Sequence, residues 1–310
     1  MRQIVGGMLL AGAVSLFAFA LYNTAWLSDD AYISYRSMDN LVHGYGLTWN
    51  TEERVQAFTN PLWVFVNLPA YLCVKTSWHV FFSGIVTSAV VALLAMVVLA
   101  LGAAETPMVA CFAVVALTFS RAFVDYSTSG LENPMTHLLL ALFMVYLLRL
   151  RWTPGVIFSM ALCAGFSLVN RMDTALIYAP VLAYAWLAER NLRATAAIAA
   201  GMLPFIAWEV FSVVYYGFPF PNTAYAKLGT GIAGHEMIAQ GVWYFWNAFT
   251  NDPLTIVLIV AGLLVAPFAL KEGKYRALAL GGLLYSVYLV KVGGDFMQGR
   301  LLTPVLMVAV

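Results

Sequence analysis

The run VFFSGIVTSAVVALLAMVVLALG, residues 80–102, is the clearest structural signal in this chain. It has 23 residues and carries no charged side chain. A helix needs about 20 mostly apolar residues to cross the hydrocarbon core of a bilayer. The run therefore predicts a membrane-spanning helix.

The composition of the whole chain agrees with this signal. Of the 310 residues 62% are apolar and 10% are charged, whereas a soluble domain has roughly 45–50% apolar and about 25% charged residues. This excludes a soluble globular enzyme, a disordered chain and a nucleic-acid binder with a basic face. The formal net charge of +1 selects no partner, and no nucleic acid is expected.

Further apolar runs predict more spans on both sides of the first. We expect an all-α, polytopic transmembrane helical bundle with about ten spans. Besides 80–102, the spans are predicted at 4–22, 107–123, 134–150, 154–169, 174–188, 194–214, 253–270 and 277–292, with a last one beginning at Leu301. The stretch 61–74 is short and contains Asn67 and Pro69, so we interpret it as a juxtamembrane or re-entrant helix that does not cross.

The loop charges predict the orientation. With the N-terminus inside, the inner connections carry, together with Arg2, eight of the 16 basic residues but three of the 15 acidic ones. This satisfies the positive-inside rule everywhere except at 103–106. The inner connections are 103–106, 149–153, 189–193 and 271–276. The alternative, that the N-terminal run is a cleaved signal peptide, is less favoured because the run is longer than a usual h-region.

The same orientation places the dense polar segments on the outer face. We therefore expect function on the extracytoplasmic side of the membrane. These segments are 23–60, 124–133, 170–173, 215–252 and 293–300.

The strongest candidate for chemistry is the pair Asp29 and Asp30, directly after the first span. Adjacent carboxylates repel, so one of them is expected to have a raised pKa and to serve as a general base for a sugar hydroxyl. Together they could also hold a divalent cation. The alternative is a solvated helix end. A short helix over 30–42 is predicted next, ended by His43 and the turn glycines Gly44 and Gly46.

A second set of outer residues is cationic. Arginine and lysine suit a phosphate group at a membrane surface, although each residue alone could equally contact lipid headgroups. This set comprises Arg36, Arg54, Lys75, Arg171, Lys227 and Arg300. Arg171 and Asp173 flank a helix break in NRMD and could neutralise each other, and the paired glycines of GGDFMQGR indicate a close backbone approach.

Other chemistries lack sequence support. The histidines His43, His79, His137 and His235 have no zinc-ligand spacing, and the three cysteines lie in apolar stretches. The chain has no Walker loop, no G-x-G-x-x-G before a helix and no G-x-S-x-G.

Five strings together resemble a known family. LSDDAYISYRSMDNLVHGYGLTWNTEERVQAFTNPLW (27–63) is similar to the first outer loop of the GT-C class polyprenyl-phosphate-sugar glycosyltransferases, in particular the terminal β-(1→2)-arabinofuranosyltransferases of mycobacteria and corynebacteria and their wider bacterial relatives. STSGLENP, NRMD, PNTAYAKLG and GGDFMQGR follow in the order of those relatives. The resemblance covers essentially the whole chain.

The resemblance implies an inverting transfer of arabinofuranose or a related sugar from a polyprenyl-phosphate donor to a cell-envelope glycan acceptor. Asp29 or Asp30 would deprotonate the acceptor hydroxyl, with a divalent cation as an option at that pair. The residues implied to stabilise the lipid phosphate are Arg36, Arg54, Lys227 and Arg300. Those implied to bind the acceptor or support the site are Glu132, Arg171, Asp173 and Asp295.

The resemblance also implies a domain organisation. We expect residues 1–310 to form one GT-C-like transmembrane module whose first outer loop is 23–79. The chain stops within an apolar run, and family members continue with further spans and a soluble domain, so we expect those parts to be missing. The alternatives from other classes are a non-catalytic membrane scaffold of the cell envelope and a transporter, although the ionisable residues gather at one surface rather than at the midplane.

Overall fold

The computed structural model describes residues 2–73, 77–228, 231–270 and 272–310, and within these ranges every regular element is a helix. The predicted all-α class is therefore confirmed. The N-terminal elements are α1 (Arg2–Thr24), α2 (Ala31–Val42), α3 (Pro61–Leu72), α4 (Ser77–Val98) with the π-helical turn η1 (Leu99–Ala103), α5 (Pro107–Thr118), α6 (Arg121–Asp125) and α7 (Asn133–Arg149).

The C-terminal half is helical as well, with more frequent breaks. Its elements are α8 (Pro154–Asn170), η2 (Met172–Thr174), α9 (Ala175–Glu189), α10 (Leu192–Gly201), α11 (Leu203–Tyr216), α12 (Asn222–Leu228), α13 (Gly234–Asn251), α14 (Pro253–Val260), η3 (Ala261–Val265), α15 (Ala266–Ala269), α16 (Gly273–Lys291), η4 (Arg300–Leu302) and α17 (Thr303–Ala309).

Several helices begin at capping residues followed by proline. Thr106, Thr153 and Asp252 each accept a hydrogen bond from a backbone N–H of the first turn, and each precedes a proline. An oxygen-bearing N-cap satisfies a free donor, and proline at the first helical position has no N–H to satisfy. These local signals explain why the apolar runs begin as helices where they do.

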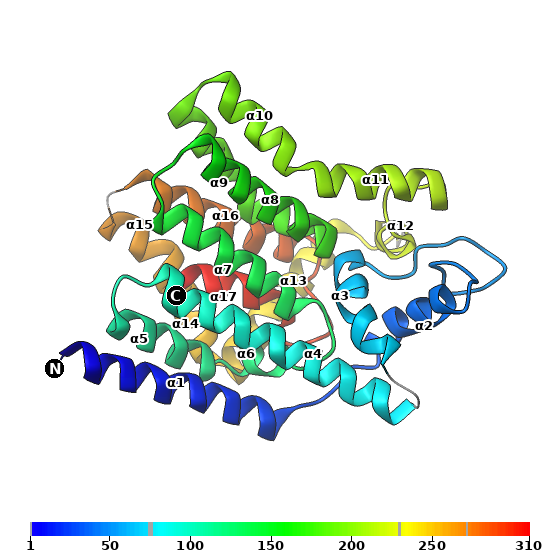
Figure 1. Cartoon of the computed structure of the whole chain (residues 1–310), viewed down its shortest axis with the longest axis horizontal. Coiled ribbons are helices and arrows are strands. Elements are labelled where there is room, and N and C mark those ends of the chain that lie inside the picture. The colour runs from blue at the N-terminus through cyan, green and yellow to red at the C-terminus, as the bar shows by residue number, and fades with distance from the viewer. Residues whose placement is uncertain (1, 74–76, 229–230, 271) are drawn as a thin grey trace.

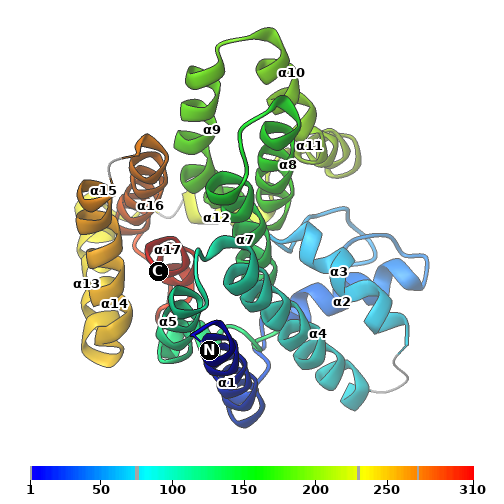
Figure 2. The same ribbon diagram turned by 60° about the vertical axis from the view of Figure 1, so that its left-hand side comes forward.

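The core is built around α7. This helix packs against α4, α8, η1 and α17, and Figure 2 shows α7 and α17 in the middle of the assembly. Its buried side chains Leu140, Phe143 and Leu147 belong to one large apolar cluster that reaches most of the bundle. Small residues bring helix backbones together elsewhere, because a Cβ added at Gly281 would collide with the backbone of α9 at Ile177.

Within the described residues, two helical segments are long and apolar enough to cross a membrane, Val5–Thr24 and His79–Ala103. Two bent pairs raise the number to four if each pair is one span: α10 with α11, bent by 47°, and α13 with Pro253–Ala269, bent by 114°. This is fewer than the ten predicted from the apolar runs. The class of helical membrane protein is supported, while the count of full-length spans is not.

Helix breaks within the predicted spans and short helices both contribute to the difference. The run 107–123 divides at Ser120, which caps α6, and the run 253–270 divides into α14, η3 and α15. Both α7 and α8 have 17 residues, or about 25 Å of helix against a hydrocarbon core of about 30 Å. The stretch predicted not to cross, 61–74, contains the 12-residue helix α3.

The polar segments gather at one end of the bundle. In Figure 1 the N-terminus lies on the left, whereas α2, α3 and α12 lie on the right. The predicted short helix at 30–42 is α2, and it ends at His43. Gly44 and Gly46 follow with φ of 82° and 93°, so the predicted turn is confirmed.

Candidate functional site

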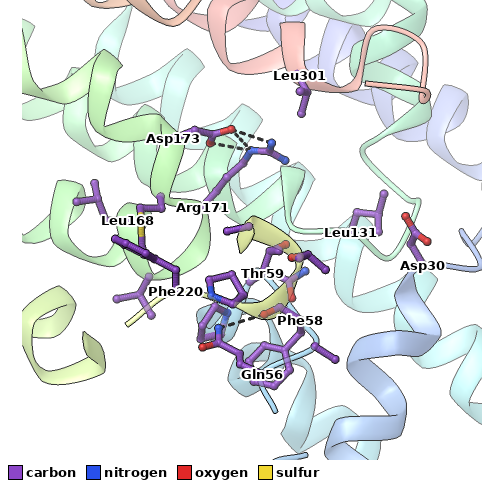
Figure 3. A pocket seen from close by; sticks show the side chains of 18 of the residues that line it. Asp30, Gln56, Phe58, Thr59, Leu131, Leu168, Arg171, Asp173, Phe220 and Leu301 are labelled. Carbon is purple, nitrogen blue, oxygen red and sulfur yellow. Dashed lines mark hydrogen bonds and ion pairs between the residues drawn. The ribbon is translucent and has the colours of Figure 1, made fainter. Parts of the chain in front are cut away.

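A cavity of about 750 Å³ lies among these polar segments. Its walls come from seven parts of the chain: residues between Asp30 and Ser34, Gln56 to Pro61, Leu131, the junction of α8 with η2 and α9, the α11–α12 region, Tyr288 on α16, and the loop from Gly294 to Leu301. Figure 3 shows Asp30 on one side of the cavity and the Arg171–Asp173 pair on another. The cavity is therefore lined by residues from all five strings that were quoted in the sequence analysis.

An alternating chain of charges lies along this cavity, with Glu132 at its centre. Glu132 is 1% exposed and accepts hydrogen bonds from Arg171 Nη1 at 2.7 Å and from Arg300 Nη2 at 2.9 Å. Arg171 in turn pairs with Asp173 at 2.8 Å, and Arg300 approaches Asp295 at 3.6 Å. Five predicted site residues are thus brought into one network.

The electrostatics of Glu132 follow from its two partners. Burial alone would raise its pKa, but the guanidinium groups of Arg300 and Arg171 outweigh burial and lower the pKa from 4.5 to about 2. A buried carboxylate between two arginines stays ionised. We therefore assign Glu132 a positioning role rather than that of a proton acceptor.

The helix break in NRMD aims Arg171 into this network. Helix α8 ends at Asn170, and Arg171 is extended, with φ −160° and ψ 106°. Asn170 Nδ2 donates to the backbone oxygen of Glu132 at 3.0 Å and to the Thr136 hydroxyl at 2.9 Å. The predicted pairing of Arg171 with Asp173 is confirmed, and its second pairing, with Glu132, comes only from the fold.

The loop before α7 ties the first outer loop to the core. The backbone oxygen of Ser129 accepts from the Ser28 N–H at 2.8 Å, and that of Gly130 accepts from Trp63 Nε1 at 2.6 Å. Asn60 Nδ2 donates to Glu132 Oε2 at 3.2 Å. These contacts fix Asp30 relative to Glu132 although 102 positions separate them, so STSGLENP connects the first outer loop to the core of the bundle.

The two adjacent aspartates have different surroundings. Asp30 lines the cavity, whereas Asp29 is exposed and is not among the lining residues. Burial raises the pKa of Asp30, the charge of Arg300 opposes this shift, and the nearby carboxylates of Asp29, Asp295 and Glu132 reinforce it. Asp29 Oδ1 accepts instead from the Asp30 N–H at 3.0 Å.

The predicted cations separate into two groups. Arg300 lines the cavity, and its buried Nε has no hydrogen-bond partner among the described residues. Arg36 and Arg54 are not brought to the cavity, which corrects their expected placement. Both are exposed: Arg36 lies 4.8 Å over the Trp49 ring and donates to the Trp49 oxygen, and Arg54 lies 5.0 Å over the ring of Tyr215. Aromatic faces, which attract guanidinium groups, hold them elsewhere.

Two lysines cannot be placed in the same way. Lys227 belongs to α12, but its side chain lies outside the described part of the chain, and Lys75 lies in the undescribed range 74–76. The close approach predicted at GGDFMQGR is confirmed, because a Cβ on Gly294 would collide with the Tyr244 ring. Gly294 also has φ of 72°.

A divalent cation at Asp29 and Asp30 does not fit this geometry well. Over the described residues no group of three or more His, Cys, Asp or Glu side chains could hold a metal ion. Asp29 is also turned toward the Ser28 hydroxyl and the Asp30 N–H rather than into the cavity. A cation at this pair stays a prediction, and we derive no step through it.

Three residues at or next to the cavity were missed in the sequence. Asn60 and Asn170 each donate to Glu132 and each lies in a quoted motif, Asn170 directly before Arg171. Glu209 lies within the apolar run 194–214 and lines the cavity. An acidic residue in an apolar helix is itself a signal of function, and that signal could have identified Glu209.

Two curated proteins are similar to this chain. One is the terminal beta-(1->2)-arabinofuranosyltransferase of Mycobacterium tuberculosis, which is 28% identical over 93% of this chain and 52% of its own length. The other is the protein of the same name from Corynebacterium glutamicum, 26% identical over 96% of this chain and 49% of its own length. The chain thus spans about half the length of these relatives. No protein-family model and no solved structure matches it significantly.

Proposed function

We propose, from the similarity to two proteins named terminal β-(1→2)-arabinofuranosyltransferase, that this chain is the transmembrane part of a glycosyltransferase of the cell envelope. It would transfer arabinofuranose or a related sugar from a polyprenyl-phosphate donor to a glycan acceptor. The observation that carries the proposal is the placement of Asp30 and Arg300 in the walls of one cavity. A general base and a phosphate-binding cation are the two groups that such a transfer needs.

The proposed reaction is one displacement. The oxygen of an acceptor hydroxyl forms a bond to the anomeric carbon of the donor sugar while the bond from that carbon to the phosphate oxygen breaks. The electron pair of the broken bond stays on the departing lipid phosphate, and the hydroxyl proton passes to the Asp30 carboxylate. Attack on the face opposite the phosphate inverts the anomeric configuration.

Asp30 has the surroundings expected of the base. Its partial burial and its acidic neighbours raise its pKa, so its carboxylate binds a proton more readily than a solvated aspartate does. Asp29 contributes charge from outside the cavity and would support Asp30 rather than contact the hydroxyl.

Arg300 is the candidate for the phosphate. Arg171 directs Nε, Nη1 and Nη2 to the carboxylates of Asp173 and Glu132, whereas Arg300 keeps an unpartnered Nε beside the cavity. Charge that develops on the phosphate oxygen would be stabilised by this donor. Apolar lining residues such as Leu168, Leu176 and Phe296 could contact the lipid chain.

The site would face the extracytoplasmic side. Its support is the gathering of α2, α3 and α12 at the end of the bundle opposite the N-terminus, together with the excess of basic residues in the loops predicted to be inside. The shorter helices would then complete the membrane domain by packing against the longer ones.

The test is a substitution at the proposed base. In membranes containing the full-length protein, Asp30→Asn should lower sugar transfer from a labelled polyprenyl-phosphate arabinofuranose by about 100-fold or more, since general-base catalysis contributes about 10²–10⁴. Asp29→Asn should cause a smaller loss. Glu236→Gln, an exposed position on α13, is the control for expression and should transfer normally. Full activity of Asp30→Asn would reject Asp30 as the general base, whereas no transfer by the wild type would favour the scaffold or transporter alternative.

A further inference from the structure

Two buried oxygen atoms in the cavity wall lack partners, and neither belongs to the charge network around Glu132. They are Glu209 Oε1 on α11 and Thr223 Oγ1 on α12, and no described residue hydrogen-bonds to either atom. Both residues line the large cavity. Buried polar atoms are nearly always paired in native proteins, so two unpaired ones that line the same cavity require an explanation.

The position of Glu209 in an apolar helix makes its unpartnered Oε1 atom unfavourable for the stability of the fold. It is the one charged residue in the α11 sequence LPFIAWEVFSVVYY. Its neighbours Val210, Val213 and Val214 are exposed apolar side chains, as expected of a helix that faces lipid. A leucine would suit this helix better, because Glu209 is half-buried and its buried Oε1 loses solvation without a hydrogen bond in return. An acidic residue retained in such a helix indicates a bound polar group.

The surroundings define the chemistry of that group. Trp208 and Phe220 line the same cavity, and Phe220 is 41% exposed. Aromatic faces beside a carboxylate and a hydroxyl suit a ring that has apolar C–H faces and hydroxyl edges. A phosphate would be repelled by Glu209. The complementary ligand is therefore an uncharged polyhydroxyl ring, that is, a sugar unit.

This part of the cavity is separate from the proposed reaction centre. In Figure 3 Phe220 lies across the cavity from Asp30. A cavity of about 750 Å³ has room for more than one sugar ring. The α11–α12 wall can therefore hold a sugar while Asp30 and Arg300 act on the scissile bond.

We propose that Glu209 and Thr223 form a sugar subsite, in which Glu209 Oε1 and Thr223 Oγ1 hydrogen-bond hydroxyl groups of a sugar unit. This inference rests on the proposed transferase function. The hydroxyls belong either to the sugar of the donor or to a sugar of the acceptor glycan, and the two sources share the same chemistry.

The kinetic test uses variants that keep the size of the side chain and remove its polar atom. Glu209→Leu and Thr223→Val should each raise KM about tenfold, the value of a hydrogen bond to a charged or well-placed group, with kcat changed less. A rise in KM for the acceptor assigns the subsite to the acceptor, and a rise for the donor assigns it to the donor. Unchanged KM for both substrates would overturn the proposal.

Thermal unfolding in detergent separates binding from structure. Glu209→Leu should unfold at a higher temperature than the wild type, because it removes an unpaired carboxylate. Glu236→Gln is the control and should change neither KM nor stability. A Glu209→Leu protein that is less stable than the wild type would show a structural role and contradict the subsite.

A binding measurement keeps this test independent of turnover. An arabinofuranose oligosaccharide should raise the unfolding temperature of Asp30→Asn but not that of the double variant Asp30→Asn/Glu209→Leu. Equal stabilisation of the two, or stabilisation of neither, would overturn the subsite. If the wild type transfers no sugar but this difference is observed, the proposed function fails while the sugar site stands.

Discussion

Arg300 Nη2 donates to both carboxylate oxygens of Glu132, at 2.9 and 3.0 Å, across 168 positions of sequence. Arg171 holds the same carboxylate from a different helix junction. The two arginines are therefore fixed relative to each other by one buried acid, and the loop from Gly294 to Leu301 is fixed to the start of α7. This pairing gives Arg300 the position from which it could contact a substrate phosphate.

Removal of the shared acid should destabilise the protein. Glu132→Gln leaves Arg171 and Arg300 buried without their common partner, which costs about 3–5 kcal/mol when a buried pair is broken. Thermal unfolding in detergent should detect this loss, and Glu236→Gln serves as the exposed control. The double variant Glu132→Gln/Arg300→Gln should recover part of the loss, and strictly additive effects would contradict direct coupling.

Replacing Arg300 by lysine should lower kcat more than replacing an exposed arginine by lysine. Arg300→Lys keeps the charge but loses the planar donor set, so kcat should fall about tenfold or more. Arg54→Lys should change kcat by less than about twofold, because Arg54 stacks on Tyr215 away from the cavity. An equal loss in both variants would contradict the assignment of the phosphate to Arg300.

Activity and stability should respond differently to acid. The pKa of Asp30 is raised above 3.8, so its base form is lost, and transfer falls, while the pH is still above that value. Glu132 has a lowered pKa of about 2 against 4.5 unfolded, so its contribution to stability is complete above about 4.5 and is lost as the pH falls toward 2. In profiles measured on one preparation, the loss of rate should have its midpoint above pH 3.8, whereas the loss of stability should continue down to about pH 2. Coincident losses would mean that the decline in rate reports unfolding.

The membrane orientation is testable with reporter fusions. Fusions at Gly155 and Gly273 should report cytoplasmic placement, and a fusion after Asn50 should report placement outside. The same fusions in a variant with Arg149 and Arg151 replaced by Ser serve as a comparison. A weaker cytoplasmic signal at Gly155 in this variant would show that the positive charges of the 149–153 loop determine the orientation. Reversed signals at the three native positions would move the proposed site to the cytoplasmic side.

The local features of the site could be read from sequence. The turn at Gly44 and Gly46, the break at Arg171 and the close approach at Gly294 were all predicted, because each depends on the conformational range of residues next to one another. The number of full-length spans was overestimated, because caps such as Ser120 and the break after Gly201 interrupt apolar runs that hydropathy treats as continuous.

The sequence by itself determined that this is a helical membrane protein with acidic and cationic groups concentrated in a few polar segments, since apolar composition and turn residues act locally. Only the tertiary structure decided which of those groups meet: Asp30 and not Asp29 lines the cavity, Arg300 and not Arg54 lies beside Glu132, and Glu209 joins them. The physical reason is that such proximity depends on how helices far apart in the chain pack around α7, which no spacing along the chain encodes.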